Sequence, residues 1–464
     1  MNRILAVEGL SVHAGNSALL RDVSFALAPG EALTLVGQSG AGKSLLAQAI
    51  MGNLPDALQA GGTVEIAGVA SAAADHRTRR PLWGRQLGLL PQEPWLALDP
   101  TMRILPQIEE TYRHVRRDGT PANARQRARE ALTGLGMADK AGHFPHQISG
   151  GMAQRVAFAA VYAGGAPILI ADEPTKGLDR RMRDEVVTLL REALLEGCAL
   201  LTITHDLEVA EALGGRLAVI QQGQIIEQGE TARLMQAPQH AYTQALLAAQ
   251  PRCWPDSSKP QLGELLLEGV GLGKAFGAQK LFADINLNIR AGEWLALTGP
   301  SGCGKTTLGN ILLGVLRPDA GVVHRHTPSP FAFQKLYQDP VASFPLRQSL
   351  RDSISDLCRR HGHAYAAFTT MMADLELDTA MLERRPDGVS GGELQRIAIA
   401  RILLMQPQLV FADEPTSRLD AITQKHTMDF LLQALGRTNA ALILVTHDDT
   451  MAERVAGRSL SLSA

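Results

Sequence analysis

Two glycine-rich stretches have the residues needed to hold a phosphate chain: G-Q-S-G-A-G-K-S at 37–44 and G-P-S-G-C-G-K-T at 299–306. Each follows an apolar run typical of a buried strand and precedes a run typical of a helix, which is the context of a phosphate-binding loop. Glycines let the backbone curl so that its N–H groups converge, and the start of the helix adds its positive end. We expect the lysine of each loop to reach phosphate oxygens and the next hydroxyl to bind Mg²⁺: Lys43 with Ser44, and Lys305 with Thr306.

Two apolar strands end in the same motif, D-E-P-T. A run that is apolar on both faces is typical of an interior parallel strand, and ligands bind at the carboxyl ends of such strands. We expect Asp172 and Asp413 to hold Mg²⁺, directly or through water. Glu173 and Glu414 would orient and deprotonate the attacking water. A solvated acidic strand end is the alternative for either motif alone, and the phosphate loops favour the chemical interpretation.

A histidine and a glutamine recur at matching places in the two halves. His205 and His447 follow apolar strands, 33 and 34 positions after the aspartates. A lone histidine there is more often structural, but the recurrence predicts a side chain that hydrogen-bonds the γ-phosphate. Gln92 and Gln338 precede turns and could be simple loop residues. Their recurrence favours a ligand of the metal or of the attacking water.

The chain is an internal repeat. S-G-G-M-A-Q-R at 149–155 returns as S-G-G-E-L-Q-R at 390–396, and each loop begins 23 positions before its aspartate. Such equal spacing indicates one α/β fold used twice. The interval from phosphate-loop lysine to S-G-G is 106 positions in the first copy and 85 in the second. We therefore expect the second copy to have lost strands near 60–80 and part of the helical region near 105–140.

The domain boundaries are predicted from the repeat and from the prolines that interrupt the chain between its two copies. We expect a first domain at 1–250, whose residues 231–250 form a helical tail, a linker at 251–263, and a second, shorter domain at 264–464. The N-terminal residues are predicted to form a strand and not a signal peptide.

Composition narrows the function classes. The formal net charge of −2 gives no electrostatic reason to expect a polyanion partner. The basic run at 113–130 could suggest nucleic acid, but a solvated helix face is the favoured interpretation. Four scattered cysteines predict neither a zinc site nor a disulfide framework. No apolar run approaches the roughly 20 residues of a membrane span, so we expect a soluble chain that reaches a membrane only through a partner.

These features together resemble the ATP-binding cassette (ABC) ATPases, over nearly the whole chain and in two copies. The set includes the S-G-G signature loops and the Leu-Asp pairs after D-E-P-T, at 178–179 and 419–420. Three segments are similar to the ATPases of peptide, nickel and opine-metallophore importers: Q-E-P-W-L-A-L-D-P, H-F-P-H-Q-I-S-G-G and A-P-Q-H-A-Y-T-Q-A-L-L. Since such importers usually use two separate ATPase chains, this chain resembles that pair fused.

The resemblance implies two P-loop domains, each with a mainly parallel RecA-like sheet core, an antiparallel β subdomain and a helical subdomain that carries the signature. It implies that an aromatic residue stacks on adenine; Phe276 fits this role, whereas the first copy has Ala14 beside His13. The implied nucleotide-binding residues are Gly37, Ser39, Gly40, Gly42, Lys43, Ser44, Gly299, Ser301, Gly302, Gly304, Lys305, Thr306, Thr307, the signature residues Ser149, Gly150, Gly151, Ser390, Gly391 and Gly392, and Phe276. Mg²⁺ would be held by Ser44, Gln92, Asp172, Thr306, Gln338 and Asp413.

The resemblance also implies how the chain works. The two halves would face head to tail, so that each signature loop covers the γ-phosphate held by the other half. The partners would be two transmembrane permease subunits and, for an importer, an extracytoplasmic substrate-binding protein, with no nucleic acid. The chain would lie on the cytoplasmic face of the inner (cell) membrane. The alternative is a tandem ATPase that acts on ribosomes, but such chains carry a long charged linker and this linker is short.

Overall fold

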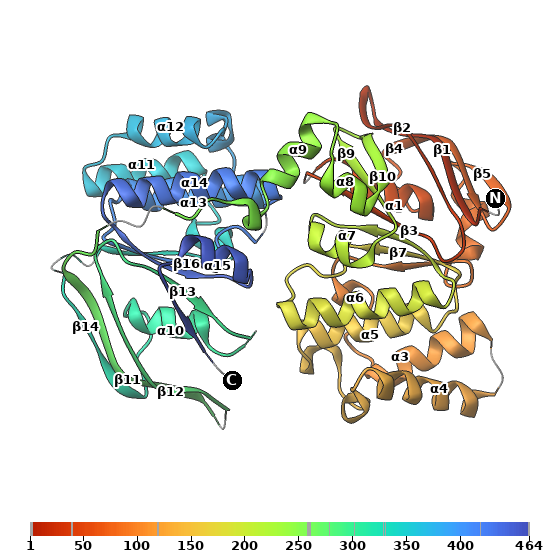
Figure 1. The fold of residues 1–464 in the computed structure, drawn as a ribbon, viewed down its shortest axis with the longest axis horizontal. Helices are drawn as coiled ribbons and strands as arrows, with labels where there is room; N and C mark the ends of the chain where they lie inside the picture. Colours follow the sequence, from red (N-terminus) through yellow and green to blue (C-terminus); the bar gives the residue numbers. More distant parts are fainter. Residues whose placement is uncertain are drawn as a thin grey trace. The chain divides into compact units, whose positions relative to one another are not determined.

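The computed structural model describes residues 3–38, 40–117, 120–257, 261–277, 279–300, 302–327, 329, 331–417 and 419–462. By its internal contacts the chain divides into two compact units, 1–247 and 248–464 (Figure 1). Both units are α/β folds, as predicted. None of the helices in the described ranges has the length and hydropathy that a membrane span requires.

A six-stranded sheet forms the centre of the first unit, in the order β10-β9-β3-β8-β7-β6. All neighbouring pairs from β9 to β6 are parallel, and β9 and β10 form an antiparallel hairpin. Parallel strands bring their carboxyl ends to one edge, which is where the loops with candidate residues follow. The strands are β3 (Ala32–Gly37), β6 (Leu87–Leu90), β7 (Ile168–Asp172), β8 (Ala199–Ile203), β9 (Arg216–Gln221) and β10 (Gln224–Glu230).

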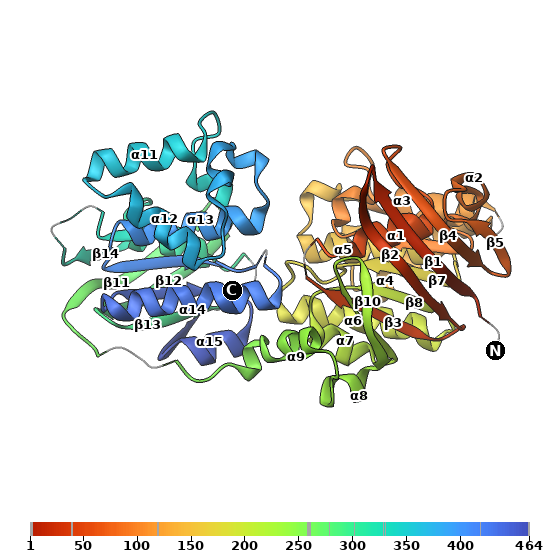
Figure 2. The same ribbon diagram turned by 90° about the horizontal axis from the view of Figure 1, so that it is seen from above.

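An antiparallel sheet in the order β2-β1-β4-β5 covers one side of this core. The side chains of β7 alternate: Ile168 and Ile170 pack with helix α1 and the antiparallel sheet, whereas Leu169 and Ala171 pack with helices α5 and α6. Figures 1 and 2 show α1 next to the antiparallel strands in both views. The elements are α1 (Lys43–Met51), β1 (Leu5–Ala14), β2 (Ser17–Leu27), β4 (Leu58–Ile66) and β5 (Val69–Ala72), followed by the short α2 (His76–Arg79).

The remaining helices of the first unit form a helical layer and a tail. Helices α3 (Ile104–Glu110), α4 (Pro121–Gly134) and α5 (Gly150–Tyr162) share a small apolar core. In α4, Ala124, Ala128 and Leu132 are buried and the arginines between them are exposed. The basic run is therefore a solvated helix face. The other helices are α6 (Arg180–Leu195), α7 (Leu207–Leu213), α8 (Thr231–Gln236) and α9 (Ala241–Ala248).

The second unit repeats the plan with fewer strands. A five-stranded parallel sheet has the order β15-β16-β17-β13-β18, and a three-stranded antiparallel sheet has the order β12-β11-β14. The strands are β11 (Leu265–Phe276), β12 (Gln279–Arg290), β13 (Trp294–Thr298), β14 (Ala320–Arg325), β15 (Phe333–Leu336), β16 (Leu409–Asp413), β17 (Ala441–Val445) and β18 (Arg458–Ser461). The helices are α10 (Lys305–Leu312), α11 (Leu350–His361), α12 (Tyr365–Asp374), α13 (Gly391–Leu404), α14 (Ala421–Arg437) and α15 (Asp449–Val455).

The shorter interval in the second copy has a structural explanation. In the first unit, β5 and α2 lie between β4 and β6. In the second unit β14 ends at Arg325 and β15 begins at Phe333, and the described residues between them form neither a strand nor a helix. The expected loss near 60–80 is thus confirmed. Both units retain two helices before the signature helix.

Residues 251–257, which follow α9, pack on the second unit. The Trp254 ring is buried in the helical core of that unit, and its Nε1–H donates to the Ala249 carbonyl at 2.8 Å. The Ser257 N–H donates to the Arg454 carbonyl at 3.1 Å, and the Arg454 guanidinium pairs with Asp256 at 2.8 Å. This part of the predicted linker is therefore fixed to the surface of α15.

Replacing Trp254 by Ala should destabilise the second unit, because it opens a cavity and leaves the Ala249 carbonyl without its donor. We expect a loss of about 3 kcal/mol in the free energy of unfolding, measured by urea denaturation followed by circular dichroism. Trp95 is 43% exposed, so Trp95→Ala is the matched control and should cost less than about 0.5 kcal/mol. Equal losses in the two variants would contradict the assignment.

Candidate active site

The phosphate loops have the backbone that the sequence predicts. Helices α1 and α10 begin directly after Gly42 and Gly304, whose φ angles are 95° and 101°, a region that favours glycine. A Cβ at Gly42 would also lie 2.5 Å from the Leu20 side chain. Among the residues that the structure describes, no side chain caps either helix start. The start of a helix favours an anion.

The loop lysines fold back over their own loops. Lys43 Nζ donates to the carbonyls of Gly37 at 2.7 Å and Gln38 at 3.0 Å. Lys305 Nζ makes the equivalent bonds to Gly299 at 2.8 Å and Pro300 at 2.9 Å. Each ammonium group thus lies at the centre of its loop, where phosphate oxygens would replace the carbonyls. Ser39 and Ser301, predicted to bind nucleotide, lie outside the described residues.

Of the predicted metal ligands, the hydroxyl and the aspartate meet in both units, whereas Gln338 contacts Glu414. The Ser44 hydroxyl donates to Asp172 Oδ1 at 3.1 Å, and the Thr306 hydroxyl donates to Asp413 Oδ2 at 2.8 Å. A hydroxyl and a carboxylate are oxygen ligands of the kind that Mg²⁺ prefers, so these residues fit that ion. Burial raises the pKa of both aspartates, although the hydroxyl contacts oppose the shift. A divalent cation would favour their ionised form.

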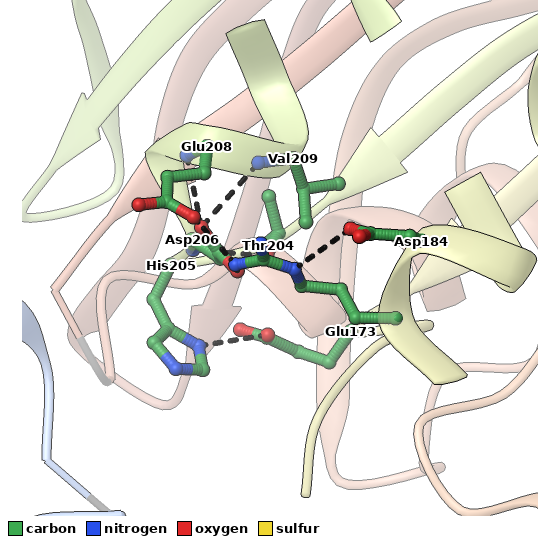
Figure 3. Close-up of polar contacts among 8 residues, drawn as sticks. Glu173, Asp184, Thr204, His205, Asp206, Glu208 and Val209 are labelled. Atoms are coloured by element: carbon green, nitrogen blue, oxygen red, sulfur yellow. Dashed lines mark hydrogen bonds and ion pairs between the residues drawn. The ribbon is translucent and has the colours of Figure 1, made fainter. Parts of the chain in front are cut away.

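The predicted general bases contact the predicted histidines. Glu173 Oε2 lies 2.8 Å from His205 Nδ1, and Glu414 Oε1 lies 2.5 Å from His447 Nε2 (Figure 3 shows the first pair). Burial alone would raise the pKa of Glu173, but the hydrogen bond and charge of His205 hold that pKa below its usual value. Burial would likewise lower the pKa of His205, and Glu173 raises it instead. In the first pair, a glutamate with a lowered pKa therefore lies beside a histidine with a raised pKa.

Both glutamates have an unusual backbone. Their φ angles are 49° and 48°, a left-handed region that costs a non-glycine residue roughly 1 kcal/mol or more. The N–H groups of Glu173 and Glu414 donate to the Ile203 and Val445 carbonyls on the neighbouring strands, at 2.7 and 3.0 Å. The turn aims each carboxylate at the histidine that follows the neighbouring strand. Strain repeated in both units is what a functional constraint predicts.

The segment around His205 is held by a network that the sequence did not reveal. Asp206 begins helix α7 and accepts hydrogen bonds from the N–H groups of Glu208 and Val209, at 2.9 and 3.3 Å (Figure 3). Arg183 of α6 reaches the same carboxylate at 3.4 Å. The second unit has Asp448 at the start of α15, with Gln424 at the position that corresponds to Arg183. The cap recurs but the arginine does not.

The two glutamines differ in their contacts. Gln338 Nε2 donates to Glu414 Oε2 at 2.6 Å, so it lies beside the predicted base. Gln92 lies in the equivalent loop after β6 of the first unit. The predicted role of Gln338 near the attacking water is compatible with its place.

The signature serines begin helices. Ser149 precedes α5 and Ser390 precedes α13, and each hydroxyl accepts the N–H of the residue three positions on, at 3.4 Å. In the second unit Glu393 accepts both the N–H and the hydroxyl of Ser390, at 3.0 and 2.6 Å. Met152 stands at the equivalent place in the first unit. Gly150, Gly151, Gly391 and Gly392 form the first turns of these helices.

Phe276 and Ala14 end the equivalent strands β11 and β1. The Phe276 side chain is 55% exposed, and Lys274 Nζ lies 5.5 Å from its ring centroid. An exposed ring at a strand end is suited to stacking on a planar base. Thr307 follows Thr306 in the first turn of α10.

Two further residues contact the sites without having been predicted. The Tyr242 hydroxyl of α9 accepts the N–H of Gln38 in the first phosphate loop at 2.9 Å. The corresponding loop residue in the second unit is Pro300, which has no N–H to donate. Lys335 of β15 lies 3.8 Å from Asp413 Oδ2. Burial lowers the pKa of Lys335, and Asp413 opposes that shift.

A phosphate loop with a metal-ligand pair and a glutamate–histidine pair defines a P-loop ATPase class, and both units contain this set. The ABC transporter family model matches residues 20–176 and 282–417. The peptidoglycan transport ATP-binding protein YejF of Agrobacterium fabrum is 33% identical, over 96% of this chain and 88% of its own length. The glutathione import ATP-binding protein GsiA of Escherichia coli K12 is 30% identical, over 98% of this chain and 84% of its own. The chain belongs to the ABC transporter family of ATP-binding proteins, and it is a tandem member with ATPase domains in both halves.

A solved structure of RNase-L Inhibitor aligns over 97% of this chain and 87% of its own, with a TM-score of 0.70 and 20% identity. At that identity the likeness shows the fold alone. It supports the predicted α/β fold.

Replacing His205 by Gln should change stability in a pH-dependent way, because glutamine keeps a donor for Glu173 but lacks the charge. The low pKa of Glu173 gives stability that is present above its usual pKa of 4.5 and lost as pH falls. The high pKa of His205 gives stability that is present below its usual pKa of 6.5 and lost as pH rises through the folded value. We expect the variant to be destabilised most between these two pH values, by roughly 1 kcal/mol.

Urea unfolding at a series of pH values measures this difference. His13→Gln is the control, since His13 lies on β1 away from this pair. A destabilisation of His205→Gln that does not vary with pH would contradict the charged pair.

Proposed function

We propose that this chain is the energy-coupling subunit of an ABC importer and that it hydrolyses MgATP at two sites. The observation that carries the proposal is the recurrence of the complete set in both units. Each has a phosphate-loop lysine, a hydroxyl–aspartate pair and a glutamate–histidine pair. A half that only bound nucleotide and did not hydrolyse it would need only the phosphate loop. Two complete sets support hydrolysis in both.

The residues of this chain would have two kinds of role: some would bind negative charge on the phosphates, and others would accept a proton from water. Lys43 and Lys305, with the N–H groups of α1 and α10, would bind phosphate oxygens. The bound Mg²⁺, held by Ser44 with Asp172 and by Thr306 with Asp413, would supply positive charge at the β- and γ-phosphates. Glu173 and Glu414 would each accept a proton from the attacking water. His205 and His447 would hydrogen-bond the γ-phosphate oxygens as negative charge develops.

Each site would be completed by the signature loop of the other half. Ser149 and Gly151 would cover the γ-phosphate held by Lys305, and Ser390 and Gly392 the one held by Lys43. The signature loops support this role because each is the start of a helix of 13 or 14 residues, where N–H groups face outward. Fusion would make the pairing intramolecular, so that it does not depend on concentration. Glu393 would make the two sites unequal, since it places a carboxylate beside one signature serine and not the other.

The cargo would be of the peptide, nickel or metal–opine type. The named relatives transport glutathione and peptidoglycan, and both molecules contain peptide bonds. The chain would therefore bind two transmembrane permease subunits at the cytoplasmic face of the membrane. An extracytoplasmic binding protein would deliver the cargo.

A ribosome-acting ATPase is the second candidate, because RNase-L Inhibitor and an archaeal ribosome recycling factor share the tandem fold at a TM-score of 0.70. Their identity of 20% carries the fold and no activity. The importer relatives are 30–33% identical over nearly the whole chain. The importer function is therefore preferred.

Replacing both Glu173 and Glu414 by Gln should abolish ATP turnover while ATP still binds, since the amides cannot accept the water proton. Hydrolysis should fall by at least about a hundredfold, measured as phosphate release, while ATP binding measured by filter retention should persist. Glu192, exposed at the end of α6, provides the control Glu192→Gln with unchanged turnover. Undiminished hydrolysis in the double variant would remove the glutamates from this role.

Purification of the tagged chain from its native cells should recover two permease subunits in a fixed ratio. The measurement is mass spectrometry of the complex after mild detergent extraction, with a sucrose gradient of the lysate run in parallel. Quantitative sedimentation with ribosomes, without permeases, would overturn the transport function in favour of the second candidate.

A further inference from the structure

The second unit contains a buried lysine that the first unit lacks. In the sheet register Phe333 pairs with Leu409, and Leu87 pairs with Ile168. Leu409 and Ile168 begin the strands that end in the two aspartates. Lys335 of β15 therefore corresponds to Leu89 of β6. A cation has replaced an apolar side chain on the strand next to the metal-ligand aspartate.

The environment of Lys335 holds its ammonium group in place. Nζ donates to Asn310 Oδ1 at 2.8 Å and lies 3.8 Å from Asp413 Oδ2. The ring centroids of Tyr337 and Phe411 lie 4.9 and 5.8 Å from Nζ, within the range of cation–π contact. The side chains of Lys335 and Asp413 are only 9% and 6% exposed. A pair so shielded from water interacts more strongly than a surface pair.

Asp413 therefore has two neighbours, the Thr306 hydroxyl at 2.8 Å and the Lys335 ammonium. In the first unit Asp172 has the Ser44 hydroxyl at 3.1 Å, and the strand beside it carries Leu89. At Asp172 a divalent cation meets a carboxylate whose neighbouring cations are Lys43 of the phosphate loop and Lys176, which is exposed to solvent. At Asp413 it meets a carboxylate that is already partly compensated, and it is repelled by a fixed positive charge a few ångströms away.

We propose that Lys335 is a built-in cation that competes with Mg²⁺ for Asp413, so that the second unit binds Mg²⁺ more weakly than the first. Lys335 is a positioning residue here, since it acts through Asp413 and the metal. The inference rests on the proposed binding of MgATP in both units. Nucleotide binding at the second phosphate loop would therefore require a higher concentration of free Mg²⁺ than binding at the first.

The test measures nucleotide binding and not turnover. Lys43→Ala disables the first phosphate loop and leaves the second, whereas Lys305→Ala leaves the first. Each full-length variant is titrated with MgCl₂ in the presence of the fluorescent analogue TNP-ATP, starting from an EDTA-treated sample. The readout is the free Mg²⁺ concentration that gives half of the maximal fluorescence change.

We expect the Lys43→Ala chain to need about tenfold more Mg²⁺ than the Lys305→Ala chain. Adding Lys335→Met to Lys43→Ala removes the charge at nearly constant length and should lower the half-point to that of the first unit. Lys335→Arg keeps the charge and is the matched control, with a half-point that stays high. Adding Leu89→Lys to Lys305→Ala should raise the half-point of the first unit.

The outcomes separate this inference from the proposed function. Equal half-points in the two chains, unmoved by Lys335→Met, would overturn the competition while leaving MgATP binding intact. Absence of TNP-ATP binding in both chains would overturn the proposed function and this inference with it. Should Lys335→Met fail to fold, judged by circular dichroism, the Leu89→Lys arm decides, since its half-point rises only if a lysine at this position opposes the metal.

Discussion

The hydrogen bond between a phosphate-loop hydroxyl and a buried aspartate is the contact on which each site depends. Ser44 comes from the loop after β3 and Asp172 from the end of β7, and β8 lies between these strands in the sheet. The same order recurs as β13, β17 and β16 in the second unit. Loops after non-adjacent strands enclose space above the middle strand, and His205 and His447 follow that strand. Sheet order thus decides which side chains can meet around a phosphate.

Burial of the two aspartates disfavours their charged form, and a bound cation would offset this effect. Burial raises the pKa of each carboxyl group, so its charged form is less favourable there than in water. The strained turn at the next residue points a glutamate in another direction, towards a histidine. Two adjacent carboxyl groups therefore contact different partners, because the glutamate of each pair is in a left-handed conformation. An extended strand would have placed them on opposite faces of the sheet.

The sequence predicted the parts whose information is local or repeated. Glycine spacing, apolar strands and strand-end carboxylates predict the phosphate loops and the side chains that meet beside them, because each motif carries its own geometry. The contacts of Tyr242 with Gln38, and of Arg183 with Asp206, could not be predicted, since both join segments whose distance in space is not encoded by any periodicity. Lys335 was overlooked although a signal existed. Its strand aligns with L-G-L-L of the first copy, and a lysine in place of Leu89 is a departure that a comparison of the two copies exposes.

Duplication makes such departures informative, because each unit serves as a reference for the other. The hydroxyl–aspartate and glutamate–histidine pairs are shared by the two units. The two units differ at four other positions near these pairs. The second unit has Lys335, Glu393, Phe276 and Pro300 where the first has Leu89, Met152, Ala14 and Gln38. None of these exchanges removes a ligand or a base, yet each alters the charge, stacking or backbone donors at a site. A fused chain can keep such changes in one half only, since the two halves always occur together, and this permits two sites with one chemistry and unequal affinities.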